Sequence, residues 1–194
     1  MSAVADGRPL LIVCSSGGHL LQMLELRDAW SGFERVWVTF DKSDARSLLR
    51  EERVVHAHSP TNRNVPNLLR NMRLAMRVLR EERPAAILTT GAGVAVPFAW
   101  AGKLLGVPTV YVESVTRIEG LSLSARLIAP VATRMYAQWP ELADASGGRI
   151  HFEGGQAKPD HVRKRDEQRG ISSTSCLGLG CQNMCSRASV RKVV

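Results

Sequence analysis

Short runs of strand-forming residues alternate along the chain with segments whose apolar side chains recur at helical spacing. The strand-like runs are Leu10–Cys14, Arg35–Phe40, Arg53–Ala57, Ala86–Thr90 and Thr109–Val112. The helical patterns are Leu20–Ala29, Ser43–Glu52, Asn67–Glu82 and a segment that ends near Leu105, with a loop at Asn62–Pro66. This alternation predicts an α/β protein with a parallel, Rossmann-like sheet of about six strands and right-handed crossovers.

The uncharged stretch Pro84–Gly102 is long enough to cross a bilayer as one helix. Its threonines, its glycines and Pro97 instead favour a strand, a glycine loop and a helix, so we expect it to belong to the sheet. Parallel sheets bind ligands at the carboxyl ends of their strands. The loops at those ends are therefore where we expect the chemistry.

The loop after the first strand contains Ser15, Ser16, Gly17, Gly18 and His19. Two glycines allow a tight turn and a close approach of a ligand to the backbone. A helix that begins after them points N–H groups at that ligand, usually an anion, and a serine can cap the helix or bind a phosphate oxygen. The helix dipole favours a neutral His19 imidazole, which can accept a proton. The alternative is a compact turn in which His19 only packs locally.

A second glycine-rich turn, Thr89–Pro97, follows the fourth strand-like run. It would frame one crevice with the first loop and would bring Thr90, Gly91 and Gly93 to that crevice. The alternative is that these small residues only allow a helix to pack closely on the sheet.

The fifth strand-like run ends at Glu113, and Ser114 and Arg117 follow it. A carboxylate in this place can orient a sugar hydroxyl or act as a base, and an arginine can hold a diphosphate. The alternative is a solvated ion pair between Glu113 and Arg117.

Two competing nucleotide motifs are weaker. The first loop lacks the G-x-G-x-x-G fingerprint of dinucleotide-binding proteins, although Asp41 stands where a ribose-binding acid would lie. A nicotinamide-dependent enzyme thus remains an alternative that rests on one acid. The D-x-D spacing of metal–nucleotide sites is absent, and the spacing of Asp41 and Asp44 fits helix capping better.

Composition changes the picture mainly near the C-terminus. The chain has 26 Lys and Arg against 18 Asp and Glu, and residues 156–194 hold eight of the former and three of the latter. Because the basic surplus is concentrated there and aromatic residues make up only 5%, a nucleic-acid-binding surface is not predicted. We expect residues 1–155 to form a Rossmann-like domain and residues 156–194, which lack apolar periodicity, to form a disordered tail.

The cysteines favour a reducing compartment. Only Cys14 lies in the body of the chain, so no disulfide framework is predicted, and the first residues do not resemble a secretory signal. Cys176, Cys181 and Cys185 could form a zinc site with His161, but their spacing lacks the paired ligands of such sites. Incidental cysteines are the preferred interpretation.

Four segments taken together resemble a known family. They are SSGGH at Ser15–His19, TTGAGVAVPFAWAGKLLGVP at Thr89–Pro108, YVESVTRIEGLSLSARL at Tyr111–Leu127 and QWPEL at Gln138–Leu142. In this order they resemble the acceptor-side, membrane-associated subunit of split UDP-sugar glycosyltransferases. Members of that family act in dolichyl-diphosphate-linked oligosaccharide synthesis and in bacterial exopolysaccharide and capsule synthesis. The chain is also distantly similar to the N-terminal half of the peptidoglycan glycosyltransferase that makes lipid II.

The resemblance implies the N-terminal, acceptor-binding half of a GT-B glycosyltransferase. The reaction would move N-acetylglucosamine or another hexose, with inversion, from a UDP-sugar to a polyprenyl-diphosphate-linked sugar. A separate donor-binding subunit would hold the UDP-sugar, and no cofactor or metal is implied. His19 would be the catalytic base or would orient the acceptor, with assistance from Glu113. The acceptor and its diphosphate would contact Ser15, Ser16, Gly17, Gly18, Thr90, Gly91, Gly93, Ser114 and Arg117.

Eukaryotic members of that family carry an N-terminal membrane helix, and none is visible in this sequence. The predicted helix Asn67–Glu82 is the substitute that we expect to touch the membrane. Its expected apolar face consists of Leu68, Leu69, Met72, Ala75, Met76 and Leu79. Its basic stripe consists of Arg70, Arg73, Arg77 and Arg80. Such a stripe suits anionic lipid headgroups at about 1 kcal/mol per residue, and it predicts a cytoplasmic protein that is peripheral on the inner face of the cell membrane. The alternative is an apolar face packed on the sheet with solvated arginines.

Two other functions remain open at this point. The chain could be a non-catalytic scaffold that recruits the donor-binding subunit to the membrane. It could also be a fragment of a glycolipid synthase whose acceptor is diacylglycerol.

Overall fold

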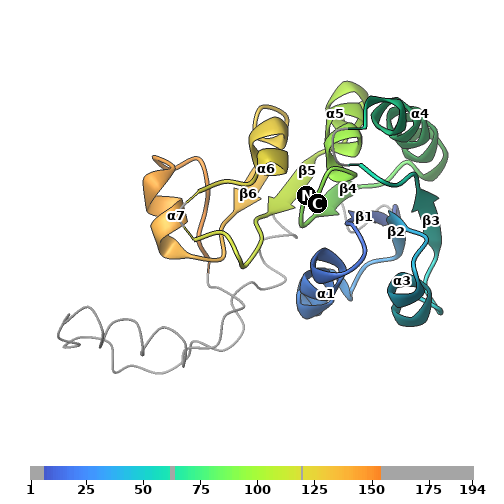
Figure 1. Cartoon of the computed structure of the whole chain (residues 1–194), viewed down its shortest axis with the longest axis horizontal. Helices are drawn as coiled ribbons and strands as arrows, with labels where there is room; N and C mark the ends of the chain where they lie inside the picture. The colour runs from blue at the N-terminus through green and yellow to red at the C-terminus, as the bar shows by residue number, and fades with distance from the viewer. Residues whose placement is uncertain (1–6, 62–63, 119, 154–194) are drawn as a thin grey trace.

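Six short strands form one parallel sheet in the computed structural model, which describes residues 7–61, 64–118 and 120–153 (Figure 1). The strands are β1 (Leu10–Val13), β2 (Arg35–Phe40), β3 (Val54–Ala57), β4 (Ala86–Thr89), β5 (Thr109–Val112) and β6 (Arg134–Tyr136). Their order is β3-β2-β1-β4-β5-β6, and every neighbouring pair is parallel. This is the strand order of a Rossmann fold, which confirms the predicted fold class. β6 completes the expected six strands, although the hydrophobic pattern did not locate it.

Helices cover both faces of the sheet. They are α1 (Gly18–Glu25), α2 (Arg27–Trp30), α3 (Ser43–Leu48), α4 (Val65–Glu82), α5 (Ala95–Leu105), α6 (Leu123–Ile128) and α7 (Pro140–Ala145). In Figure 1, α4, α5 and α6 lie above the sheet, and α1 and α3 lie below it. Alternate strand residues enter the two layers: Leu11 and Val13 join the core that includes α4 and α5, whereas Leu10 and Ile12 join the core that includes α1.

The helix after β1 differs from the expected Leu20–Ala29. It begins two residues earlier, at Gly18, and is interrupted at Leu26. The Met23 carbonyl lies at this interruption, where it accepts a hydrogen bond from the Leu26 amide at 3.2 Å and another from the Trp30 indole at 2.8 Å. Because the indole reaches back to this carbonyl, it fixes the short second helix against the end of the first.

Two other boundaries also differ. The helix after β2 ends at Leu48 instead of continuing to Glu52. Pro66 belongs to the first turn of α4, although we expected it in the preceding loop. Proline fits that turn because the N–H group that it lacks would have no partner there, and the Asn64 side chain caps the helix by accepting from the Asn67 amide at 3.0 Å.

The buried face of α4 is not the expected apolar face. It consists of Asn67, Asn71, Leu74, Ala75, Val78 and Leu79. Of the expected apolar face, only Ala75 and Leu79 are fully buried, and contact of the remaining members with a membrane stays a prediction. The side chains of Leu68 and Leu69 are exposed, and those of Met72 and Met76 are half-buried.

Two asparagines account for this rotation of the helix. The Asn71 side chain accepts from the His58 amide at 2.8 Å and donates to the His58 carbonyl at 2.9 Å. Asn67 donates to the Pro60 carbonyl at 2.9 Å. Buried polar groups are stable when they are hydrogen-bonded, so both asparagines face the protein. This orientation leaves Leu68 and Leu69 exposed and Met72 and Met76 half-buried.

The uncharged stretch Pro84–Gly102 folds as β4, a glycine loop and most of α5, as predicted. Within the part of the chain that the structure describes, no helix is both long and apolar enough to cross a membrane. The expected tail at residues 156–194, with Cys176, Cys181, Cys185 and His161, lies outside the described residues. The expected domain boundary near residue 155 thus stays a prediction.

Candidate functional site

The three predicted loops meet at one edge of the sheet. β1, β4 and β5 are neighbours in the sheet, so the loops at their carboxyl ends are neighbours too. The Thr90 hydroxyl donates to the His19 carbonyl at 3.1 Å, which joins the second loop to the first. The Gln22 side chain on α1 donates to the Glu113 carbonyl at 2.8 Å, which joins the first loop to the third. The predicted convergence of the loops is therefore confirmed.

The first loop leaves open space at the start of α1. Gly17 precedes the helix with φ 78° and ψ −136°, a backbone conformation that residues other than glycine rarely adopt. Neither Gly17 nor Gly18 has a heavy atom within 4 Å of the place where a Cβ would stand. No side chain caps the helix, so of the two roles considered for Ser15 and Ser16 the capping role is wrong, and the binding of a phosphate oxygen stays a prediction. A ligand can therefore approach the first-turn amides, which have no partner within a helix.

Asp44 holds the first loop in place, a role that the sequence did not reveal. Its carboxylate accepts a hydrogen bond from the Gly17 amide at 2.6 Å. The expectation that Asp41 and Asp44 cap α3 is wrong, because Lys42 precedes that helix and no side chain caps it. Asp41 instead pairs with Arg46, which lowers the pKa of the Asp41 carboxyl. An Asp41 engaged in this way is a poor match for a ribose-binding acid.

The His19 side chain is half-buried, and this burial favours its neutral form. Burial lowers the pKa of His19 below its usual 6.5, while the Thr90 backbone and the negative charge of Glu113 oppose that shift. The neutral form was predicted from the helix dipole, and the structure gives burial as the main cause. Nδ1 of His19 is sealed from solvent and has no hydrogen-bond partner among the described residues. Leaving a buried polar atom without a partner is unfavourable. Because Nδ1 is sealed, a proton taken from a ligand would have to reach the other ring nitrogen, Nε2.

The second loop is closely packed. Gly91 has φ 97°, and a Cβ there would stand 2.6 Å from the hydroxyl of Tyr111. A Cβ on Gly93 would stand 2.8 Å from the hydroxyl of Thr61. Both distances are shorter than real Cβ contacts, so packing alone requires these two glycines. Thr90 is fully buried and acts on the first loop through its bond to the His19 carbonyl.

Glu113 connects the end of β5 to the start of α6. Its side chain is almost completely buried. Oε1 accepts from the Tyr111 hydroxyl at 3.1 Å and from the Ser114 amide at 2.9 Å. Oε2 accepts from the Ser122 amide at 3.0 Å and from its hydroxyl at 3.2 Å. Ser122 in turn caps α6 by accepting from the Ala125 amide at 3.1 Å. Both carboxylate oxygens are thus occupied by donors of the protein itself.

The rest of the third loop lies outside this network. Ser114 is half-buried, and its hydroxyl lies 2.9 Å from that of Thr116. The Arg117 side chain is exposed and forms no ion pair with Glu113, so the alternative of a Glu113–Arg117 pair is wrong. The Trp139 indole donates to the Val115 carbonyl at 2.6 Å and so anchors the loop. Arg117 remains available to an anion near the loop.

The described part of the chain contains no group of three or more His, Cys, Asp or Glu side chains that could hold a metal ion. The groups that the site offers are an open helix start, a neutral imidazole and an exposed guanidinium. Together they can bind an anionic group and remove a proton from a hydroxyl beside it.

Curated proteins from distant organisms are similar to this chain. The UDP-N-acetylglucosamine transferase subunit ALG14 of Debaryomyces hansenii is 28% identical over 167 residues, which cover 71% of this chain and 72% of that protein. The subunit of the same name from Mus musculus is 27% identical and covers 70% of this chain and 77% of its own length. A bacterial relative from Herminiimonas arsenicoxydans is 25% identical over 68% of this chain and 39% of that protein. Its name describes transfer of N-acetylglucosamine to a pyrophosphoryl-undecaprenol-linked acceptor.

Solved structures share the fold. MurG of Acinetobacter baumannii superposes with a TM-score of 0.62 at 18% identity, over 80% of this chain and 48% of that one. UDP-N-acetylglucosamine 2-epimerase of Rickettsia bellii gives a TM-score of 0.60 at 13% identity, over 86% and 49%. This chain therefore spans about half the length of these structures. The predicted class, a Rossmann-like half of a GT-B protein, is confirmed at the level of the fold.

The family itself is assigned by a match over much of the chain. The family model described as "Oligosaccharide biosynthesis protein Alg14 like" matches residues 48–154, which is more than half of the 194 residues. This range contains the second and third loops of the site. The chain belongs to the family of Alg14-like oligosaccharide biosynthesis proteins.

Proposed function

We propose that the chain is one subunit of a UDP-sugar-dependent glycosyltransferase. It would transfer N-acetylglucosamine, or a related hexose, to a polyprenyl-diphosphate-linked sugar in polysaccharide or lipid-linked oligosaccharide synthesis. The family assignment and the names of the relatives, which are UDP-N-acetylglucosamine transferase subunits, support this proposal. The observation that carries it is the neutral His19 beside the open start of α1.

His19 would act as the general base. A neutral imidazole can take the proton of the acceptor hydroxyl, whose oxygen then attacks the anomeric carbon of the donor sugar while UDP leaves with the bonding electrons. The first-turn amides of α1 and the exposed Arg117 would hold the acceptor diphosphate, because both favour negative charge. Ser15, Ser16 and Ser114 are half-buried at the same edge and would bind the acceptor by hydrogen bonds. The buried Thr90 would instead act through its hydrogen bond to the His19 carbonyl.

A second subunit would complete the enzyme. The relatives are named as subunits of a transferase. The chain contributes one Rossmann-like sheet that matches about half of MurG, which supports a partner that supplies the other half of a two-domain enzyme. That partner would bind the UDP-sugar. The active site would then lie between the two chains, with the loops of this chain facing the acceptor.

The helix layer above the sheet would face the membrane. Val65, Leu69, Met72 and Met76 form an exposed or half-buried apolar strip on α4. The basic stripe of Arg70, Arg73, Arg77 and Arg80 runs beside this strip. On the neighbouring helices α5 and α6, Trp100, Leu104, Leu123 and Leu127 are also exposed. Apolar side chains flanked by arginines suit a bilayer interface that contains anionic lipid.

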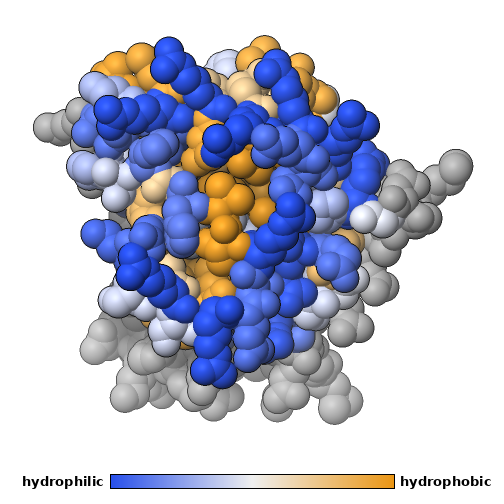
Figure 2. All heavy atoms as spheres, turned by 90° about the vertical axis from the view of Figure 1, so that its right-hand side faces the viewer, coloured by the Kyte–Doolittle hydropathy of each residue, from blue (hydrophilic) through white to orange (hydrophobic). Residues whose placement is uncertain are grey.

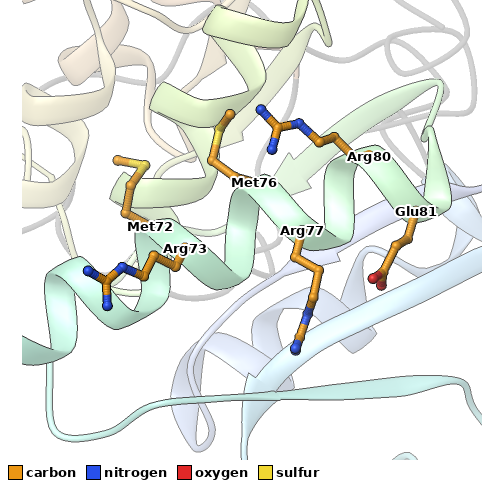
Figure 3. Close-up of a pocket in the computed structure, with 6 residues that line it drawn as sticks. All are labelled: Met72, Arg73, Met76, Arg77, Arg80 and Glu81. Atoms are coloured by element: carbon orange, nitrogen blue, oxygen red, sulfur yellow. The ribbon is translucent and has the colours of Figure 1, made fainter.

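Apolar and hydrophilic side chains lie close together on this part of the surface. On the side of the molecule seen in Figure 2, hydrophilic side chains surround a narrow hydrophobic strip. Figure 3 shows a hollow of about 420 Å³ on α4, where Met72 and Met76 project from the same side of the helix and Arg80 lies next to Met76. Arg73, Arg77 and Arg80 form no ion pair with another described residue, so their charges stay available for lipid.

Reconstitution tests the proposal. The purified chain alone should show negligible transfer from UDP-N-acetylglucosamine to a polyprenyl-diphosphate-linked sugar, and activity should appear when the donor-binding subunit is added. Substantial turnover by the isolated chain would refute a split enzyme. If the pair were active and His19→Ala left it fully active, the chain would be a scaffold instead. On vesicles, Met72→Glu/Met76→Glu should release the chain from the membrane, and co-sedimentation equal to that of the unaltered chain would reject the membrane-facing helix layer.

A further inference from the structure

A second cavity lies apart from the candidate site, at the β6 edge of the sheet. It has a volume of about 570 Å³ and is bordered by α6, β6 and the segment that follows α7. Figure 1 shows α6 beside β6, on the side of the sheet opposite β3. Arg134 begins β6, whereas the candidate site lies beyond the carboxyl ends of β1, β4 and β5. No residue that lines this cavity belongs to that site.

The lining carries positive charge and no negative charge. It contains Arg126 of α6, Arg134 of β6, and Arg149 and His151 of the segment after α7, and none of its residues is acidic. None of the three arginines forms a hydrogen bond or an ion pair through its side chain with another residue of the described chain. Three guanidinium groups around one hollow repel one another, and an anion bound between them would relieve that repulsion.

Hydrogen bonds of the sheet fix the backbone near Arg134 and Arg149. Arg134 is paired with Val110 in the ladder between β5 and β6. His151 forms a parallel bridge with Tyr136: its amide donates to the Met135 carbonyl at 2.9 Å, and its carbonyl accepts from the Ala137 amide at 2.8 Å. The segment that carries Arg149 and His151 is therefore held to the edge of the sheet by one β-bridge at His151. Charges held in this way lose less conformational freedom when they bind a ligand.

Part of the lining is apolar. Leu121, Ala129, Pro130 and Met135 contribute to it, and Met135 is buried in the core. The mixture of apolar side chains and guanidinium groups suits an anion with an apolar part close to its charge. Arg126 also lies one helical turn from the exposed Leu123 and next to the exposed Leu127, so the cavity adjoins an apolar surface of α6.

We propose that this cavity binds a phosphate group. Arginine is the side chain best suited to phosphate, because its planar fork can donate two parallel hydrogen bonds to two phosphate oxygens. Two sources offer this chemistry: a soluble phosphate or diphosphate, and the headgroup of an anionic phospholipid that reaches the cavity beside Leu123 and Leu127. The inference does not depend on the glycosyltransferase proposal, since no residue of the candidate site takes part.

Binding by the full chain tests the inference. Titration calorimetry with pyrophosphate, at about 0.15 M ionic strength where distant charges are screened, should give saturable binding. The double substitution Arg134→Ala/Arg149→Ala should weaken it by about tenfold or more, since it removes two donors of charge-assisted hydrogen bonds. Arg134→Lys/Arg149→Lys keeps the charge but loses the fork, so it should fall between the two. Both arginines are exposed, and circular dichroism should show an unchanged fold.

A second arm identifies the source of the phosphate. Flotation with phosphatidylcholine vesicles that contain phosphatidylglycerol should be reduced by Arg134→Ala/Arg149→Ala if a lipid headgroup occupies the cavity. Arg27→Ala/Arg50→Ala is the matched control, because it removes two exposed arginines elsewhere on the surface. Loss of pyrophosphate binding alone supports a soluble ligand, and loss of vesicle binding alone supports a lipid headgroup. Equal losses in the cavity and control variants would overturn the proposal, and so would no loss with either probe.

Discussion

The two glycine loops of the site have similar composition and opposite surroundings. A Cβ on Gly17 or Gly18 would meet nothing within 4 Å, whereas a Cβ on Gly91 would stand 2.6 Å from the Tyr111 hydroxyl. The first loop therefore leaves room for a ligand, and the second fills its own space with the side chains of neighbouring strands and loops. Glycine thus leaves open space in one loop and permits close packing in the other, within one edge of one sheet.

The three loops of the site also have different roles. The first loop carries the group that would react, His19, and presents the start of α1. The second and third loops support it: Thr90 bonds the His19 carbonyl, and Glu113 ties β5 to α6. We therefore infer that Glu113, predicted as a catalytic assistant, is a positioning residue, because its oxygens already accept four hydrogen bonds from the protein.

The largest effect is expected at His19. In the reconstituted pair, His19→Ala should lower kcat by about 10²–10⁴, the usual contribution of a general base, with the fold intact. His19→Asn keeps a hydrogen bond but cannot take a proton, and should be nearly as slow. Because the pKa of His19 is lowered, the rate should fall on acidification with a midpoint below 6.5. Recovery of most of kcat in His19→Asn, with the loss in the acceptor KM, would assign His19 to acceptor positioning.

The next largest effect should appear at Gly91 as a loss of stability. Gly91→Ala would push a methyl group into the Tyr111 hydroxyl and would place alanine at φ 97°. Overpacking costs about 1–3 kcal/mol and a left-handed non-glycine residue about 1–2 kcal/mol more. Urea denaturation should therefore show a large drop in the unfolding midpoint. An unchanged midpoint would contradict the packed description of the second loop.

Glu113→Gln should have a smaller, mixed effect. An amide in place of the carboxylate leaves at least one buried donor without an acceptor, which costs about 1–3 kcal/mol of stability. It should also lower the pKa of His19 further, because the Glu113 charge raises that pKa. Nuclear magnetic resonance titration of the His19 ring measures this shift, and thermal denaturation measures the stability. If the pKa of His19 did not fall, the charge of Glu113 would have no electrostatic effect on the first loop.

The smallest structural effect is expected at Gly18. Gly18→Ala places its methyl group in open space at the start of α1 and should leave stability within about 1 kcal/mol, since alanine favours helix. If the diphosphate approaches this backbone, kcat/KM for the acceptor should nevertheless fall by about tenfold, mainly through a higher acceptor KM. Gly32→Ala is the control, because Gly32 also has open space around its Cβ position. If Gly18→Ala and Gly32→Ala were both fully active, the acceptor diphosphate would not bind in the open space of the first loop.

Local patterns in the sequence were sufficient for the architecture. Strands such as Leu10–Val13 and Thr109–Val112 are short and almost wholly apolar, as buried parallel strands must be, so their order along the chain predicts the sheet. β6 was not located because three residues that include Arg134 give little hydrophobic signal. The meeting of the three loops also followed from the sequence, since it needs only the rule that parallel strands end at one edge.

The facing of α4 shows where such patterns fail. Periodicity treats asparagine as a solvent-facing residue, but Asn67 and Asn71 are buried because backbone groups of residues 58–60 satisfy their amides. Those partners lie 7 and 13 residues away, in the loop before the helix, so the periodicity within the helix does not reveal them. The same holds for Asp44, whose bond to the Gly17 amide joins positions 27 residues apart.

What the sequence by itself determined was therefore the fold, the place of the site and the types of chemical group that meet there. Tertiary structure decided which of those groups is accessible. Glu113 and His19 are both titratable residues beyond strand ends, but Glu113 is almost completely buried among four donors, whereas the His19 side chain is half-buried at the open start of α1. This difference arises from contacts between loops of different strands, because only the assembled sheet brings Tyr111, Ser122 and Gly91 to the same few ångströms of space.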